Sequence, residues 1–206
     1  MTTETTTTSV PWDDARWLNP PVSAQPDGDS LLVTAREGSD FWRTTAYGFV
    51  HDDGHGLLID FPDQHAVEVS FVLDYSGTFD QAGIFVRAAS GTWTKAGVEW
   101  SDGAPQLGAV VTKGFSDWST APVPEWWGKE VTVRVSRSGD ALTVRARADG
   151  EWRLVRLAPL DPARHWQAGP FCCAPMRADL TVRFTRFAIG PADTSLHDEV
   201  PDEASE

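Results

Sequence analysis

Apolar and polar residues alternate along several segments of the chain. Residues 67–73 place apolar side chains at every second position, and the same period of two recurs over 131–136 and 142–147. Successive side chains of a strand point to opposite faces of a sheet, so each segment is predicted to be a strand with one buried face. No segment has a helical stripe of even three turns. The pattern therefore predicts an all-β chain.

Turn residues divide these segments at regular intervals. Asp-Gly pairs stand at 27–28, 53–54, 102–103 and 149–150, and Ser-Gly pairs at 76–77, 90–91 and 138–139. Such pairs supply the positive φ of tight hairpins, and this spacing is typical of a β-sandwich. In the last strand the apolar parity changes between Phe184 and Phe187, which predicts a bulge near Thr185–Arg186.

The pattern contains no internal repeat and no linker, so one domain of two packed antiparallel sheets is expected over residues 12–190. The Thr-rich segment 1–11 and the acidic segment 191–206 have little apolar surface to order them. Both are predicted to be disordered tails.

The composition limits which binding partners and which cellular location are expected. The 206 residues carry a formal charge of −13 at pH 7, which argues against nucleic acid and anionic membranes. There is no run of 18 apolar residues and no secretory signal, so a cytoplasmic protein is expected. Cys172 and Cys173 are adjacent and should face opposite sides of a strand as reduced thiols, with a vicinal redox switch as the alternative.

Six short segments occur in an order that resembles a known family. They are Asp40-Phe41-Trp42, Tyr47-Gly48-Phe49, Phe79-Asp80-Gln81-Ala82-Gly83, residues 93–100, Ser116-Asp117-Trp118-Ser119 and residues 169–175. Together they resemble the YesU-like family, labelled "regulation of enolase", in the concanavalin A-like lectin/glucanase superfamily. The family pattern has Tyr where this chain has Phe79 and Trp100. The resemblance implies a jelly-roll sandwich with a concave face. It does not imply a settled activity.

Strand parity brings several polar side chains to one sheet face. If residues 81–87 and 93–100 pair through the Ser90-Gly91 turn, five residues share a face: Gln81, Arg87, Trp93, Lys95 and Glu99. Arg134 could reach this face from a later strand, and Trp118 lies in a polar, loop-like segment. Indoles stack on sugar rings, and planar polar groups bind hydroxyls, so these seven residues are a candidate site for a carbohydrate or sugar acid. The alternative is a charged ladder that only solvates the sheet.

Catalysis is not the expectation, although it stays open. A glycoside hydrolase needs two opposed carboxylates, and the Glu-x-Asp-x-x-Glu pattern of glucanases is absent. Glu99 is the best single candidate, because Asp80 has the wrong parity. Lys95 and Arg87 are expected to keep Glu99 ionised. An enzyme acting through Glu99 or Lys95, with Arg87 as an anion clamp, remains an alternative.

No cofactor or metal is expected. The segment from His51 to His55 resembles a metal cluster, but Asp53-Gly54 is explained by a hairpin turn, and further ligands are missing. Trp42, Trp100 and Trp152 are interpreted as packing residues. In the Trp126-Trp127 pair, one indole is expected to face outward at the rim.

Three hypotheses follow. The first is a non-enzymatic protein that binds a carbohydrate or sugar acid on its concave face. The second is a regulatory protein-interaction module that uses the rim aromatics, and the third is the enzyme just described. The sequence also leaves a homodimer open.

Overall fold

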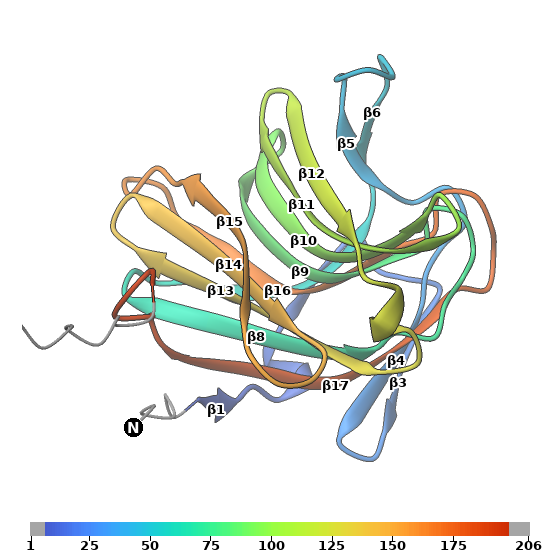
Figure 1. The fold of residues 1–206 in the computed structure, drawn as a ribbon, viewed down its shortest axis with the longest axis horizontal. Coiled ribbons are helices and arrows are strands. Elements are labelled where there is room, and N and C mark those ends of the chain that lie inside the picture. The colour runs from blue at the N-terminus through green and yellow to red at the C-terminus, as the bar shows by residue number, and fades with distance from the viewer. Residues whose placement is uncertain (1–6, 198–206) are drawn as a thin grey trace, which may run out of the picture.

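The computed structural model describes residues 7–197 and shows two large antiparallel sheets packed face to face (Figure 1). Among the described residues the only helices are two 3-10 turns, η1 (Trp12–Asp14) and η2 (Pro124–Trp126). No helix in this part of the chain is long and apolar enough to cross a membrane. The prediction of an all-β sandwich is confirmed.

The eight-stranded sheet has the order β15-β14-β13-β8-β17-β4-β3, with β1 added to β17. Its strands are β1 (Thr8–Ser9), β3 (Ser23–Asp27), β4 (Ser30–Thr34), β8 (His65–Val72), β13 (Glu130–Ser138), β14 (Ala141–Arg147), β15 (Arg153–Pro159) and β17 (Thr181–Pro191). The predicted bulge is present, because the register of β17 against β8 shifts between Phe184 and Arg186.

The seven-stranded sheet has the order β12-β11-β10-β9-β16-β7-β2. Its strands are β2 (Arg16–Leu18), β7 (His55–Asp60), β9 (Gln81–Ala89), β10 (Thr92–Ser101), β11 (Ala104–Lys113), β12 (Ser116–Pro122) and β16 (Gln167–Cys173). A separate hairpin of β5 (Phe41–Arg43) and β6 (Val50–Asp52) projects from the sandwich (Figure 1).

The buried apolar side chains form two clusters. The larger one lies between the sheets and contains the residues that the alternation assigns to the buried parity, such as Val69, Ile84 and Val133. The smaller cluster lies on the outer face of the seven-stranded sheet, which is the face turned away from the eight-stranded sheet. It consists of Phe41, Trp42, Leu58, Phe85, Trp93, Val110, Phe171 and Cys173. The hairpin therefore buries part of a face that the sequence predicts to be open.

Most of the predicted turns occur. Gly28, Gly91, Gly103, Gly139 and Gly150 have positive φ and stand between paired strands. The hairpin expected at Asp53-Gly54 is wrong, because β6 pairs with β5 and this dipeptide leads instead into the seven-stranded sheet. Glycine is needed there for packing, since an added Cβ would lie 2.4 Å from the Phe41 ring.

Residues on both sides of the predicted range 12–190 make contacts with the sandwich. Thr8 and Ser9 pair with β17, and Asp193 binds the Arg134 guanidinium at 2.8 Å. The rest of the two segments predicted to be tails, residues 1–6 and 198–206, lies outside the described residues.

Cys172 and Cys173 are free, buried thiols on opposite faces of β16, as predicted. Cys172 belongs to the cluster between the sheets and Cys173 to the outer-face cluster. Burial raises the pKa of Cys172 to about 12 and also raises that of Cys173. Neither thiol is therefore activated at neutral pH.

Candidate functional site

The register of β9, β10 and β11 places three glycines side by side on the seven-stranded sheet. Gly83 pairs with Gly97, and Gly97 pairs with Gly108. We call these three residues the glycine row. One flank of the row is polar, because Gln81 pairs with Glu99 and Glu99 with Gln106. The opposite flank carries Lys95, Val110 and Trp118, which are paired in the same way.

Close approach of the strands explains why this row is glycine. A Cβ at Gly97 would lie 2.1 Å from the carbonyl oxygen of Ala82, and one at Gly83 would lie 2.1 Å from that of Ala96. A Cβ at Gly108 would lie 2.5 Å from the carbonyl oxygen of Ser119. These contacts are with backbone atoms, which cannot turn aside as a flexible side chain could. The sheet therefore has a strip without side chains on its outer face.

A pocket lies over this strip and includes Gly97 and Gly108 in its floor. It is a shallow, open depression, and its empty space of about 280 Å³ includes open solvent. The side chains that line it most prominently are Gln81, Lys95, Glu99, Gln106, Val110, Trp118 and Phe171. Four of the seven predicted residues are thus brought together, namely Gln81, Lys95, Glu99 and Trp118. Trp118 remains 40% exposed, so its indole is accessible to a ligand.

Lys95 is a buried cation with two partners. Its Nζ donates to Oδ1 of Asp40 at 2.9 Å and to Oε1 of Gln81 at 2.8 Å, and Gln81 Nε2 donates to the same Asp40 oxygen at 3.2 Å. Burial acts to lower the pKa of Lys95, but the Asp40 carboxylate and other anionic groups outweigh it and raise the pKa above its ordinary value. The alternative of a charged ladder that only solvates the sheet face is therefore wrong for Lys95, which is only 5% exposed.

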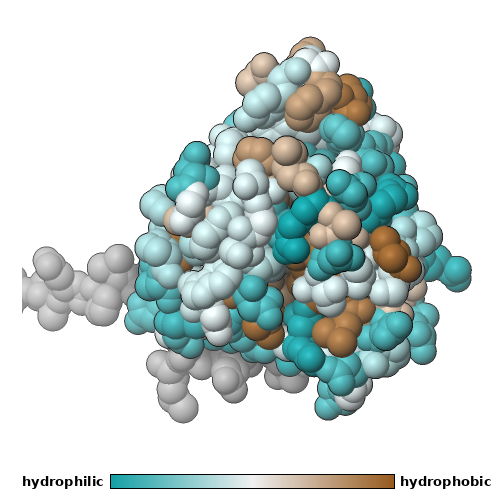
Figure 2. All heavy atoms as spheres, turned by 90° about the vertical axis from the view of Figure 1, so that its right-hand side faces the viewer, coloured by the Kyte–Doolittle hydropathy of each residue, from teal (hydrophilic) through white to brown (hydrophobic). Residues whose placement is uncertain are grey.

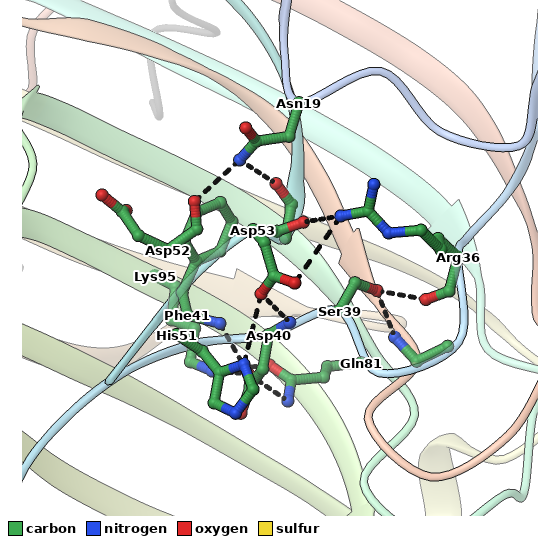
Figure 3. Close-up of polar contacts among 12 residues, drawn as sticks. Asn19, Arg36, Ser39, Asp40, Phe41, His51, Asp52, Asp53, Gln81 and Lys95 are labelled. Atoms are coloured by element: carbon green, nitrogen blue, oxygen red, sulfur yellow. Dashed lines mark hydrogen bonds and ion pairs between the residues drawn. The ribbon is translucent and has the colours of Figure 1, made fainter. Parts of the chain in front are cut away.

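Asp40 is the site residue that the sequence reasoning missed. It stands immediately before β5, and its backbone N–H donates to Oδ1 of Asp53 at 3.2 Å (Figure 3). Asp53 in turn contacts Arg36 at 3.6 Å and His51 Nδ1 at 3.3 Å. This network fixes the base of the hairpin and directs the Asp40 carboxylate toward Lys95. The only signal in the sequence was the Asp40-Phe41-Trp42 segment of the family resemblance.

Glu99 has no ion-pair partner within residues 7–197, because the Lys95 ammonium is held by Asp40 and Gln81. The Ser101 side chain is the hydrogen-bonding neighbour of the Glu99 carboxyl group. Burial raises the pKa of Glu99 from 4.5 to about 7, against the opposing effect of Lys95. The expectation that neighbouring cations keep Glu99 fully ionised is therefore wrong, because desolvation is the larger effect.

The raised pKa of Glu99 predicts a pH-dependent stability. The unfolded chain binds this proton with a pKa near 4.5 and the folded protein with a pKa of about 7. The contribution to stability is fully present below pH 4.5 and is lost as pH rises through 7. Urea unfolding between pH 5 and 8 should show this loss in the wild-type protein and a flatter profile in Glu99→Gln. Parallel profiles for the two proteins would contradict the assignment.

Three predicted site residues do not line the pocket. Arg134 is on β13 of the eight-stranded sheet, where it binds Glu68 at 2.8 Å, so the expectation that it reaches the same face is wrong. Trp93 has the predicted parity but is 1% exposed, because Phe41 and Phe85 pack against it. It cannot stack on a ligand in this structure. Arg87 pairs with Trp93 in the sheet, away from the pocket lining.

The remaining candidates have structural explanations. His55 is buried, with Nδ1 2.7 Å from the carbonyl oxygen of Asn19 and Nε2 accepting from the Arg36 N–H at 2.9 Å. Burial lowers its pKa, so it is a neutral core histidine. The described part of the chain has no group of three or more His, Cys, Asp or Glu suited to a metal ion. Asp80 binds Arg177 at 2.8 Å rather than joining Glu99.

The Trp126-Trp127 pair divides as predicted. Trp126 is buried in η2, whereas Trp127 is 44% exposed and packs against Trp100 with ring centroids 5.0 Å apart. Trp42 belongs to the outer-face cluster, in agreement with its interpretation as a packing residue.

Comparison with known proteins supports the fold and identifies the family. The chain is 39% identical over 184 residues to a Saccharomyces cerevisiae protein named "Regulation of enolase protein 1", covering 88% of this chain and 92% of that protein. The crystal structure of a functionally unknown protein from the same yeast has a TM-score of 0.83 at 36% identity, covering 88% of this chain and 98% of that one. The yeast relative agrees with the "regulation of enolase" label of the resemblance.

More distant structures share the sandwich alone. The xylan β-1,4-xylosidase of Bacillus halodurans C-125 has a TM-score of 0.60 at 14% identity, covering 78% of this chain and 32% of that one. Within the chain itself, residues 17–192 match the family model described as "Protein of unknown function (DUF1349)". The match spans the strands that build the pocket and the hairpin beside it. The chain therefore belongs to the DUF1349 family.

Proposed function

We propose that the pocket over the glycine row binds a neutral carbohydrate. One observation carries the proposal: the exposed indole of Trp118 and the carboxyl group of Glu99, which has no ion-pair partner among the described residues, line the same pocket. Gln106 adds an amide to this lining, and the glycines of the floor carry no side chain that would block a ring lying over them. A sugar presents an apolar C–H face and a rim of hydroxyl groups, which suits an aromatic plate beside polar groups.

The charges favour a neutral sugar over a sugar acid. Lys95 is the one cation in the pocket lining that the structure describes, and its charge is balanced by Asp40 at 2.9 Å. Arg134, which could have bound a carboxylate, lies on the other sheet. Any ionised fraction of Glu99 would repel an anion. A structural neighbour of the sandwich is a xylan β-1,4-xylosidase. By analogy of fold, xylose-containing saccharides are therefore a ligand class to test.

Removing the Trp118 indole should weaken sugar binding while leaving the fold intact. Titration calorimetry with xylose, glucose and their oligosaccharides is expected to show about a tenfold loss of affinity in Trp118→Ala, which corresponds to about 1.4 kcal/mol. The matched control is Trp127→Ala, because Trp127 is similarly exposed but lies outside the pocket lining. Equal affinities in wild type and Trp118→Ala, or no saccharide binding by the wild type, would contradict the proposal.

A second candidate is acid–base catalysis on the bound sugar. The observation that favours it is the pKa of about 7 for Glu99, since a general acid or base works best with a pKa near the working pH. Release of new reducing ends from xylohexaose during prolonged incubation would support catalysis. If the protein binds the oligosaccharide but does not cleave it, catalysis is contradicted and only the binding function stands.

A further inference from the structure

The hairpin of β5 and β6 presents aromatic side chains to solvent next to the pocket. Tyr47 is 59% exposed and Phe49 is 43% exposed, and both lie in the loop that joins the two strands. Figure 1 shows the hairpin projecting from the sandwich beside the strands that carry the pocket. In Figure 2 the projecting tip carries hydrophobic surface. Large exposed apolar side chains grouped in this way usually mark a binding surface.

These side chains form a continuous series that begins in the pocket. Trp118, which lines the pocket, lies edge-to-face against Trp42 with ring centroids 6.3 Å apart. Trp42 lies edge-to-face against Tyr47 at 5.5 Å, and Tyr47 stacks on Phe49 at 5.4 Å. We call these four residues the aromatic ladder. The ladder leads from the pocket to the tip of the hairpin.

The loop that carries the outer half of the ladder is held in one conformation. Thr44 N–H donates to the Phe49 carbonyl oxygen at 2.7 Å, and Trp42 Nε1 donates to the Thr45 carbonyl oxygen at 2.9 Å. Thr44 and Ala46 have φ values of 63° and 64°, in the left-handed region that non-glycine residues rarely adopt. Strained backbone of this kind is concentrated at binding and catalytic sites.

The base of the hairpin is also anchored next to the pocket strands. Arg43 N–H donates to Ser116 Oγ at 2.9 Å, and Arg43 Nε donates to the Gly114 carbonyl oxygen at 3.3 Å. Ser116 opens β12, the strand that carries Trp118. The two halves of the ladder are therefore fixed relative to each other before any ligand binds, which lowers the entropic cost of binding.

We propose that the exposed outer rings of the aromatic ladder, Tyr47 and Phe49, form a second subsite, so that the ligand is a chain of several sugar rings rather than a monosaccharide. This inference rests on the proposed carbohydrate binding in the pocket. Two observations favour further sugar rings over a protein partner. The ladder is continuous with the pocket through Trp118, and only three of its side chains are exposed, whereas a stable protein interface needs about 800 Å² from each partner.

The test is the dependence of affinity on chain length. Calorimetry would compare xylose, xylotriose and xylohexaose, and in parallel glucose, cellotriose and cellohexaose. In the wild type, one hexasaccharide should bind at least about tenfold more tightly than its monosaccharide. In the double variant Tyr47→Ala/Phe49→Ala, the hexasaccharide should lose this advantage while the monosaccharide binds as before. Unchanged monosaccharide affinity also shows that the variant pocket is folded.

The control is Val22→Ala, which removes an exposed apolar side chain beside β3 and β4 of the other sheet and should change neither affinity. Equal affinity for all chain lengths, or a hexasaccharide advantage that survives in the double variant, would overturn the ladder while leaving the pocket proposal intact. No binding of any saccharide by the wild type would overturn the pocket proposal itself. Self-association that disappears in the double variant, without length dependence, would assign the ladder to a second copy of this chain and overturn the subsite.

Discussion

Replacing Lys95 by methionine is expected to lower the free energy of unfolding by about 3 kcal/mol, because removal of one partner of a buried ion pair leaves the other charge without compensation. The Asp40 carboxylate would lose its 2.9 Å contact, and Gln81 Oε1 would lose its 2.8 Å donor. For a domain of this size the melting temperature should fall by roughly 10 °C. Urea unfolding and calorimetry measure both quantities.

A surface pair provides the control for this experiment. Lys129 contacts Asp149 at 2.7 Å, but both side chains are well exposed. Lys129→Met should therefore cost less than about 1 kcal/mol. The double variant Lys95→Met/Asp40→Asn should recover part of the lost stability, since it removes the uncompensated charge. A loss in Lys95→Met no larger than that in Lys129→Met would show that the buried pair does not hold the hairpin base to the sheet.

Gly97→Ala should be the other strongly destabilising change, again by about 3 kcal/mol, because overpacking against atoms that cannot move is costly. The new Cβ would lie 2.1 Å from the Ala82 carbonyl oxygen and 2.7 Å from the Gly83 Cα. The strands β9 and β10 would have to separate at the centre of the sheet. The same methyl group would alter the pocket floor, so sugar binding should weaken together with stability.

Gly56→Ala is the matched control within the same sheet. An added Cβ at Gly56 meets its nearest neighbours at 3.5 Å, which is ordinary van der Waals contact. Its free energy of unfolding should change by less than about 1 kcal/mol. Similar stability in the two variants, measured by urea unfolding, would show that β9 and β10 can accommodate a side chain in the glycine row.

The alternation of side chains predicted the strands well, because it depends only on the chain's own geometry. The alternation of apolar and polar residues within each strand shows which side chains of residues 67–73 are buried. The same alternation predicts the bulge near Thr185. The turn at Asp53-Gly54 could not be predicted in this way. Its residues suit a hairpin, but β6 pairs with β5, and that choice depends on where the Phe41 ring must pack.

Strand parity predicted which residues of the site share a sheet face. Gln81, Lys95 and Glu99 do share a face, because β9 and β10 pair in the expected register. Parity cannot show what covers a face, so the burial of Trp93 under Phe41 was not foreseen. It also cannot show how strongly a group is desolvated, and desolvation is what separates the pKa of Glu99 from the expected value.

The position of β17 has a consequence for how the chain reaches its native state. This strand lies between β4 and β8, pairing Phe184 with Leu31 on one side and with Phe71 on the other. The N-terminal hairpin of β3 and β4 cannot join its sheet until residues 181–191 arrive, and the edges of β4 and β8 stay unpaired until then. Such long-range pairing slows folding and leaves strand edges open to incorrect partners. Folding during synthesis should therefore finish only when the last strand is released, with the two ends of the domain locking together in one late step.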